Sequence, residues 1–199
     1  VCDLVAMGRS QIVDPDFCNK AKAGDVENIR LCMGCNVGCF DVTAEPFGPT
    51  STPIRCTRNP FVCREGQPHI FRKAAAPKKV LVAGGGYGGL ITANMLKAKG
   101  HTPIVCEASS QLGGAMLMAG KNEYKKEMAQ AVHWEAKQCE KNGIEIRLNT
   151  PVTPALIEEI KPEAVIIAIG GKPYLPDYVT GLEQPNVYTY LDVMTDKVA

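Results

Sequence analysis

Hydrophobic and polar positions follow two different periods in the second half of the chain. Short apolar runs, typical of strands buried in a parallel sheet, are separated by longer stretches in which apolar residues recur as on one face of a helix. Strands that alternate with helices predict an α/β fold with a parallel sheet and right-handed crossovers. The predicted strands are 79–83, 102–106, 144–148 and 164–169, and the predicted helices are 90–99, 122–141 and 153–161.

The longest predicted helix has a continuous apolar face. Residues recurring at helical spacing can share one side of it and are more typical of core than of a cofactor site. These residues are Tyr124, Met128, Ala131, Val132 and Cys139.

The first third of the chain has a weaker pattern. The apolar run Asp3–Met7 ends in Gly8-Arg9, which predicts a buried parallel strand followed by a turn,. Backbone N–H groups at a glycine turn and an arginine fork can bind phosphate, although such a pair is more often a plain turn. A short helix is predicted over 16–22, after the helix-start pattern Asp14-Pro15,.

Two segments without periodicity divide the chain. Residues 72–79 have the composition of a linker and predict a domain boundary, and residues 41–53, rich in Pro, Gly, Ser and Thr, predict a surface loop,. The chain starts at a valine without a cap and ends without a compact final element. We therefore expect it to be an internal segment of a longer polypeptide.

Composition excludes several classes of protein. The 199 residues carry 22 basic and 21 acidic side chains, a net charge of +1, so no global field favours nucleic acid or an acidic membrane,. No apolar run approaches the roughly 18 residues of a membrane span. Nine cysteines are many, and their odd number argues against a secreted disulfide framework,. A reducing, cytoplasmic compartment is the expectation.

Four cysteines have the spacing of ligands to one inorganic centre. Cys32, Cys35, Cys39 and Cys56 follow the pattern C-x2-C-x3-C-x16-C. Thiolates are the ligands of iron–sulfur clusters, and three close cysteines reduce the entropy cost of assembling one. A structural zinc site is the alternative, but such sites usually pair two C-x2-C hooks.

The remaining cysteines have other expected roles. Cys63 could compete as the fourth ligand, but the Asn59-Pro60 turn after Cys56 favours Cys56. The other four are interpreted as small buried hydrophobic residues: Cys2, Cys18, Cys106 and Cys139,.

A glycine-rich turn joins the first predicted strand of the sheet to the following helix. Its pattern is G-x-G-x-x-G: Gly84 allows the tight turn, Gly86 lets the backbone approach a pyrophosphate, and Gly89 lets the helix pack closely,. The next strand ends in Glu107, expected to accept hydrogen bonds from an adenosine ribose. Gly113-Gly114 offers a second close backbone approach. No catalytic residue is predicted, because the three histidines are widely separated in sequence.

These motifs, in this order, resemble the multidomain branch of the Old Yellow Enzyme family, the group of 2,4-dienoyl-CoA reductase, 2-enoate reductase and trimethylamine dehydrogenase. The resemblance implies an FMN-bearing TIM barrel, a [4Fe–4S] loop and an FAD-binding domain interrupted by an NAD(P)H-binding domain. Residues 1–31 would be the last strand and helix of the barrel, 32–76 the iron–sulfur segment with its linker, and 77–199 the first part of the Rossmann-like FAD domain.

The resemblance also implies roles for individual residues. Gly8 and Arg9 would contact the FMN phosphate, and Cys32, Cys35, Cys39 and Cys56 would bind the cluster. The residues expected to contact FAD are Gly84, Gly86, Gly88, Gly89, Glu107, Gly113, Gly114, Lys121, Val152 and Gly170. The gap of sixteen residues before Cys56 is longer than is usual in the family.

The implied function is reduction of an activated C=C bond in an unsaturated acid or acyl-CoA. Electrons would pass from NAD(P)H through FAD and the cluster to FMN. The substrate pocket and proton donor would lie upstream of this chain, so we expect no activity from it alone. An amine dehydrogenase of the same family and a non-catalytic electron-transfer subunit are the alternatives, and the parent enzyme could form a homo-oligomer.

Overall fold

The computed structural model describes residues 2–43, 53–67, 70 and 72–195. The chain forms two compact units, Val1–Arg72 and Lys73–Ala199, and the division falls at the start of the predicted linker 72–79. Most of the predicted surface loop 41–53 lies outside the described residues.

The second unit is built on a parallel sheet of four strands in the order β3-β2-β1-β4. Each of the four strands predicted in this unit is present, and every pairing between them is parallel. Strands of parallel sheets are typically nearly continuous apolar runs, as β1, β2 and β4 are here, which made these three predictable,. The strands are β1 (Lys79–Ala83), β2 (Thr102–Cys106), β3 (Glu145–Arg147) and β4 (Ala164–Ile167).

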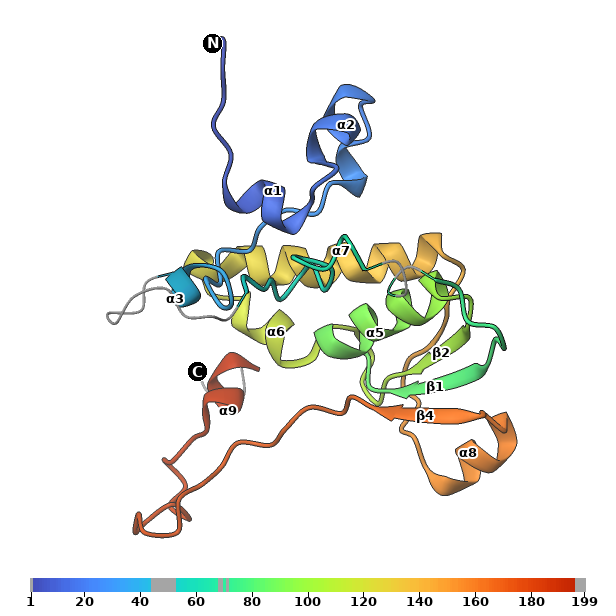
Figure 1. The fold of residues 1–199 in the computed structure, drawn as a ribbon. Helices are drawn as coiled ribbons and strands as arrows, with labels where there is room; N and C mark the ends of the chain where they lie inside the picture. Colours follow the sequence, from blue (N-terminus) through green and yellow to red (C-terminus); the bar gives the residue numbers. More distant parts are fainter. Residues whose placement is uncertain (1, 44–52, 68–69, 71, 196–199) are drawn as a thin grey trace. The chain divides into compact units, whose positions relative to one another are not determined.

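Helices cover both faces of this sheet (Figure 1). On one face, α5 (Tyr87–Ala98) and α7 (Lys126–Lys141) enclose a core that contains Val82, Val105 and Leu90. On the other face, α8 (Pro154–Ile160) packs against a second core that contains Leu81 and Ile104. The α/β class is therefore confirmed, with the layers of a doubly wound sheet.

The predicted apolar face of α7 is correct except at its start. Ala131, Val132 and Cys139 are buried, and burial raises the pKa of the Cys139 thiol to about 12,. Tyr124, in contrast, is 86% exposed. It lies in the short 3-10 helix η2 (Glu123–Lys125) before α7, whose tighter winding does not continue the α-helical face,.

Two glycines fix the junction between β1 and α5. Gly84 has φ 109°, in the left-handed region, and a β-carbon there would lie 2.4 Å from the carbonyl oxygen of Ala168,. A β-carbon on Gly89 would lie 2.0 Å from the carbonyl oxygen of Gly84. The helix therefore approaches the strand more closely than any residue with a side chain allows.

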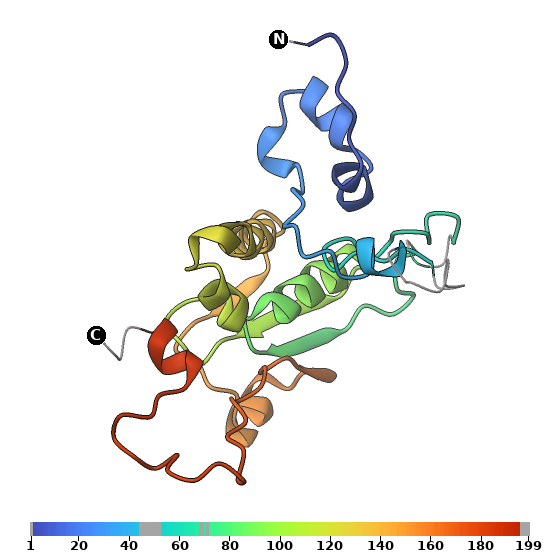
Figure 2. The same ribbon diagram turned by 90° about the vertical axis from the view of Figure 1, so that its left-hand side faces the viewer.

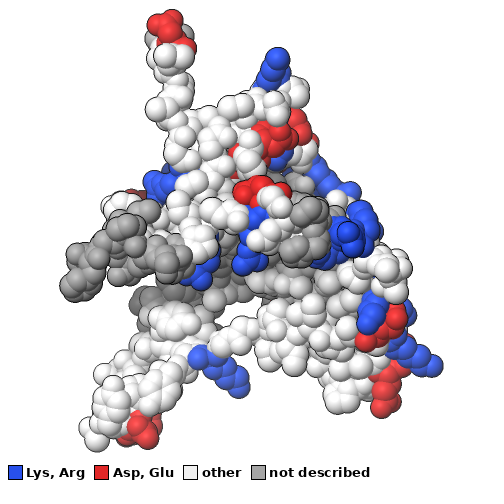
Figure 3. Space-filling model, in the orientation of Figure 1, with Lys and Arg blue, Asp and Glu red and all other residues white. Residues whose placement is uncertain are grey.

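Two short helices complete the second unit. α6 (Gly114–Ala119) follows the second glycine pair, and α9 (Tyr190–Met194), which the sequence analysis did not predict, lies beside it (Figures 1 and 2). The segment between β4 and α9 exposes several large apolar side chains and carries few charges (Figure 3). These side chains are Tyr174, Leu175, Tyr178, Val179, Val187 and Tyr188.

The first unit contains little hydrophobic core. Its helical elements are α1 (Arg9–Val13), α2 (Phe17–Lys22), η1 (Val26–Asn28) and α3 (Phe40–Thr43). Among its described residues, only Val13 and Ile29 are buried hydrophobic side chains. Polar interactions, described below, take the place of a larger core.

The predicted strand Asp3–Met7 is not a strand in the structure. The segment pairs with no strand of the described chain, and Leu4 is 90% exposed. A parallel strand is buried only when neighbouring strands and helices cover it, and this unit supplies none to the described segment.

The prediction of burial is also wrong for two of the four cysteines interpreted as small hydrophobic residues. Cys2 and Cys18 are exposed, whereas Cys106 and Cys139 are buried in the second unit. The difference follows the amount of hydrophobic core that each unit contains.

No described helix has both the length and the apolar character required to cross a membrane.

We expect Gly89→Ala to destabilise the second unit by about 3 kcal/mol, because the obstructing atom is a backbone oxygen that cannot move without displacing β1. Trp134, the only tryptophan, lies in α7, so its fluorescence during denaturant unfolding reports this unit. Gly88→Ala is the matched control. It lies in the same helix with nothing within 4 Å of the added carbon, and we expect it to be neutral or to gain up to about 1 kcal/mol,. Equal stabilities of the two variants would contradict the close approach.

Candidate functional site

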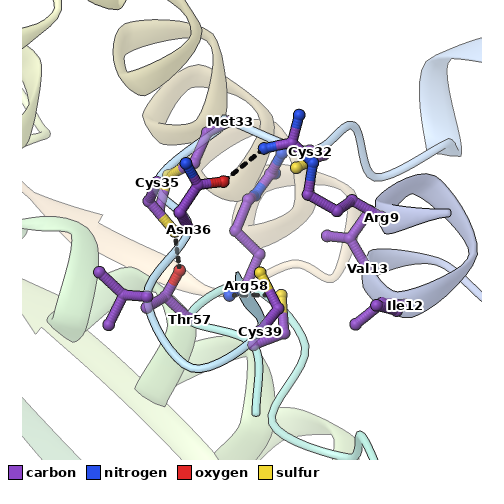
Figure 4. A pocket seen from close by; sticks show the side chains of 12 residues that line it. Arg9, Ile12, Val13, Cys32, Met33, Cys35, Asn36, Cys39, Thr57 and Arg58 are labelled. Atoms are coloured by element: carbon purple, nitrogen blue, oxygen red, sulfur yellow. Dashed lines mark hydrogen bonds between the residues drawn. The ribbon is translucent and has the colours of Figure 1, made fainter. Parts of the chain in front are cut away.

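The four cysteines of the C-x2-C-x3-C-x16-C pattern line one cavity in the first unit (Figure 4). The cavity has a volume of about 310 Å³, including its opening to solvent. Each of the four is partly buried, whereas Cys63 is exposed and lies outside the lining. Apolar side chains, including Ile12, Val13 and Met33, form much of the remaining wall.

A backbone pairing brings the distant fourth cysteine to the other three. Gly38 has φ 81°, and its carbonyl oxygen accepts a hydrogen bond of 2.6 Å from the backbone N–H of Arg55. A β-carbon on Gly38 would lie 2.9 Å from the Arg55 carbonyl oxygen, so only glycine permits this approach,. Cys39 and Cys56, the neighbours of the paired residues, are thereby placed at one cavity.

Hydrogen-bond donors surround the sulfur atoms. The N–H of Gly34 donates to Cys32 Sγ and the N–H of Arg58 donates to Cys56 Sγ, both at 3.4 Å. The Thr57 hydroxyl lies 3.2 Å from Cys35 Sγ. Donors of this kind influence the potential of an iron–sulfur cluster.

The segment after Cys56 is anchored by two buried polar residues. Arg58 donates from Nη1 to the carbonyl oxygen of Leu31, the residue before Cys32. Asn59 donates from Nδ2 to the carbonyl oxygen of Ile12 at 2.8 Å. Both ends of the cysteine pattern are therefore fixed to each other and to α1.

Asp14 is a third buried polar anchor, only 3% exposed. Its carboxylate pairs with Lys20 Nζ at 2.8 Å and accepts from the backbone N–H of Arg30 at 2.8 Å. Burial alone would raise the pKa of Asp14, but the hydrogen bond from Lys20 and those from the backbone outweigh it, so the pKa lies below its usual value,. The ionised carboxylate ties α1 and α2 to the segment that enters Cys32.

The donor set fits an iron–sulfur cluster. Four thiols with N–H donors in a partly apolar cavity are the ligands and surroundings that such clusters use. In the described part of the chain, no three His, Cys, Asp or Glu side chains converge closely enough to coordinate a single metal ion. A cluster distributes its thiolates over several iron atoms and so tolerates their wider separation.

Arg9 lines the same cavity, and Gly8 is outside the lining. Gly8 precedes the first turn of α1, and Arg9 Nη1 donates to Asn36 Oδ1 at 2.6 Å. Arg9 thus contacts the cysteine loop, a contact that the sequence analysis did not anticipate. Its expected contact with an FMN phosphate stays a prediction.

The second unit contains a larger cavity of about 1860 Å³, including its mouth, where the carboxyl ends of β1, β2 and β4 meet. This edge of a doubly wound sheet is where dinucleotides bind. Two of the residues expected to contact FAD, Gly89 and Lys121, lie outside the lining. The expected residues that do line it are Gly84, Gly86, Gly88, Glu107, Gly113, Gly114, Val152 and Gly170.

The two glycine motifs meet at this cavity. Gly86 and Gly113 form a parallel bridge, and the N–H of Gly113 donates to the carbonyl oxygen of Gly85 at 2.8 Å. Helix α5 begins directly after Gly86, and no side chain caps its N-terminus. Its first N–H groups and the positive end of its dipole are therefore suited to a pyrophosphate.

Glu107 lies at the end of β2, at the edge of this cavity. Its Oε2 accepts from the Gly85 N–H at 2.7 Å, and its Oε1 accepts from the N–H and hydroxyl of Ser109, each at 2.8 Å. Burial would raise the pKa of Glu107, but these hydrogen bonds outweigh it and lower the pKa. The Glu107 carboxylate is therefore ionised at the cavity edge, where the sequence analysis expected a ribose contact.

The sequence analysis missed the contribution of α9 to this cavity. Tyr190, Leu191 and Thr195 line it, although the helix has only five residues and too little length for a periodic pattern. A local signal does exist: Thr189 and Asp192 form a capping box in which each side chain binds the other's backbone N–H,.

Comparisons with known proteins place the chain in a family. The NADH oxidase of Thermoanaerobacter brockii is 33% identical over 199 residues, which cover 99% of this chain and 30% of that protein. The multifunctional alkene reductase/demethylase OYE of Caballeronia cordobensis is 31% identical, covering 98% of this chain and 27% of that protein. No family model matches the sequence.

Solved structures agree with these relatives. A complex of 2-naphthoyl-CoA reductase with 2-naphthoyl-CoA matches 97% of this chain and 28% of its own, with a TM-score of 0.87 and 32% identity. The chain belongs to the Old Yellow Enzyme-like iron–sulfur flavoenzymes, as the sequence analysis expected. It spans less than a third of the length of these relatives.

We expect Asp14→Asn to weaken the first unit by about 2 kcal/mol at pH 7, because it removes the charge that Lys20 and the Arg30 N–H bind. The lowered pKa of Asp14 means that its stabilisation is present above the ordinary carboxyl pKa, roughly 4, and is lost as pH falls through the lower folded value,. Hydrogen exchange of residues 14–30 should therefore accelerate about 30-fold in the variant at pH 7, and the difference should shrink in acid.

Asp16→Asn is the control for this comparison, because Asp16 is exposed and its carboxylate accepts only from Asn19 Nδ2 in the described hydrogen bonds. We expect its exchange to stay close to that of the unsubstituted chain. Equal protection of the Asp14 and Asp16 variants at pH 7 would contradict the anchoring role of Asp14.

Proposed function

We propose that this chain is the electron-transfer segment of an iron–sulfur flavoenzyme that uses NAD(P)H to reduce an activated C=C bond in an enoate or enoyl-CoA. The observation that carries the proposal is the cavity at which four cysteines separated by as many as 24 positions come together. The names of the relatives, an NADH oxidase, an alkene reductase and a 2-naphthoyl-CoA reductase, support the direction of electron flow.

In this proposal the first unit holds a [4Fe–4S] cluster, which when bound accepts and releases one electron at a time. Cys32, Cys35, Cys39 and Cys56 are its ligands. The N–H groups of Gly34 and Arg58 stabilise two of the sulfur atoms, and the apolar wall limits the access of water.

The second unit holds FAD, which when bound can take a hydride and release its electrons singly. The N-terminus of α5 and the paired Gly86 and Gly113 would receive the pyrophosphate, and the Glu107 carboxylate would accept a hydrogen bond from a ribose hydroxyl. Val152 lines the same cavity and would contact the adenine.

The proposed domain assignment follows from these sites. Residues 1–31 would end the FMN barrel, 32–76 would form the cluster segment, and 77–199 would be the first part of the FAD domain. Gly8 and Arg9 would contact the FMN phosphate. Arg9 has five N–H donors, and the described hydrogen bond to Asn36 uses one of them,.

Oxidation of an amine is the second candidate, because a relative from Hyphomicrobium is named a dimethylamine dehydrogenase and the relative from Caballeronia cordobensis is named a demethylase as well as an alkene reductase. Electrons would then leave FMN through the cluster instead of reaching it. Assays of the full-length enzyme distinguish the two directions: NAD(P)H oxidation that depends on an enoate supports the first, and dye reduction by a methylated amine without NAD(P)H supports the second.

We expect Cys56→Ser to lose most bound iron and acid-labile sulfide after anaerobic reconstitution, because serine does not replace a thiolate ligand well. Cys63→Ser is the matched control and should retain the full content, since Cys63 is exposed and lies outside the cavity. Zinc without sulfide in the unsubstituted chain would refute the cluster, and loss of sulfide in the Cys63 variant alone would reassign the fourth ligand.

We expect Glu107→Gln to weaken FAD binding by about 10- to 100-fold, because one amide N–H₂ group replaces an oxygen that accepts backbone hydrogen bonds. FAD fluorescence during titration of the chain measures the affinity. Glu158→Gln, on the exposed surface of α8, controls for the loss of one negative charge. Unchanged affinity in the Glu107 variant would argue against its ribose contact.

A further inference from the structure

Arg58 is a buried cation at the cysteine cavity. Its residue is only 3% exposed, and it lines the cavity together with the four cysteines (Figure 4). The guanidinium group keeps its positive charge under all ordinary conditions in proteins. A full charge therefore lies in a poorly hydrated place beside the atoms proposed to bind the cluster.

Hydrogen bonds hold both the backbone and the side chain of Arg58. Its backbone N–H donates to Cys56 Sγ at 3.4 Å, and its Nη1 donates to the carbonyl oxygen of Leu31, next to Cys32. The residue thus connects the first and last cysteines of the pattern. Because both contacts hold it in place, its charge acts on the cavity from a defined direction.

Two other arginines near the cysteines are in a different environment. Arg9 also lines the cavity, but it is exposed and bonded to Asn36. Arg55, adjacent to Cys56, is exposed and outside the lining. Water and salt screen exposed charges strongly, whereas a buried charge is screened much less. Among these three arginines, Arg58 has the strongest expected effect on a group bound at the cysteines.

We infer that Arg58 raises the reduction potential of the iron–sulfur cluster that the four cysteines hold, an inference that rests on the proposed function. A [4Fe–4S] cluster with four thiolates carries a charge of about −2 when oxidised and about −3 when reduced. Reduction adds one electron and no proton, so a fixed positive charge nearby stabilises the reduced form more than the oxidised one. Reduced flavin supplies the electron in the proposed enzyme, and dithionite supplies it in a titration.

Side-chain substitution leaves the hydrogen bond from the backbone N–H of residue 58 to Cys56 Sγ in place. It removes the charge together with the hydrogen bond to Leu31, and the Lys variant separates the two effects. We expect Arg58→Met and Arg58→Gln to decrease the ratio of reduced to oxidised cluster at least tenfold at a fixed ambient potential. A tenfold change corresponds to about 59 mV for one electron. Arg58→Lys, which keeps the charge, and Arg55→Met, which removes an exposed charge, should change the ratio less than threefold.

The experiment is a potentiometric titration of the reconstituted chain, followed by electron paramagnetic resonance of the reduced cluster. Iron and sulfide contents are measured first for every variant. An unsubstituted chain that binds no iron and sulfide would overturn the proposed function and this inference together. A fully loaded Arg58→Met or Arg58→Gln variant with an unchanged potential would overturn the inference alone.

Arg58→Lys keeps the inference testable if the neutral variants do not assemble the cluster. The ratio of reduced to oxidised cluster in this variant should differ less than threefold from that of the unsubstituted chain, since the positive charge is retained. A tenfold or larger shift in the loaded Lys variant would show that contact geometry, and not charge, controls the potential, and would overturn the inference.

Discussion

The first unit depends on a chain reversal that hydrophobic burial does not drive. The hydrogen bond between Arg55 and Gly38 brings Cys56 to the cysteine loop, and Gly38 is the residue that allows the approach. With only two buried hydrophobic side chains among its described residues, this unit gains little from apolar burial. Buried polar anchors, Asp14 among them, supply the specificity instead. Ligand binding at such a site contributes directly to folding, so cluster assembly and stability of this unit should be coupled.

The second unit, in contrast, is held together by hydrophobic burial. Two hydrophobic cores hold helices on both faces of the sheet, and Gly84 and Gly89 let α5 approach β1 closely. The same close approach leaves the N-terminus of α5 open at the carboxyl edge of the sheet. A stable core therefore positions a helix end that is suited to an anion. Only Glu107, which accepts hydrogen bonds from Gly85 and Ser109, places a charge among the expected FAD contacts that line this cavity.

The sequence alone predicted those parts of the structure that depend on residues close together in the chain. The strands β1, β2 and β4 were predictable because they are almost entirely apolar runs,. The four cysteines could be grouped because three of them lie within eight residues. The prediction of a strand over Asp3–Met7 was wrong, because its apolar residues are buried only if other strands pair with the segment. Helix α9 is too short for periodicity. Arg58 and Asn59 were missed as buried residues, because the burial of a polar side chain is decided by partners far away in sequence.

The buried charges of the first unit can be understood together. An isolated ion in a protein interior costs several kcal/mol, and an opposite charge nearby offsets part of this cost. Lys20 does this for Asp14 at 2.8 Å. An anionic cluster at the four cysteines would do the same for Arg58, and the attraction is mutual. The guanidinium should therefore favour assembly of the cluster as well as its reduction. Since the reduced cluster carries the larger negative charge, the same residue should hold the cluster more tightly after it has accepted an electron.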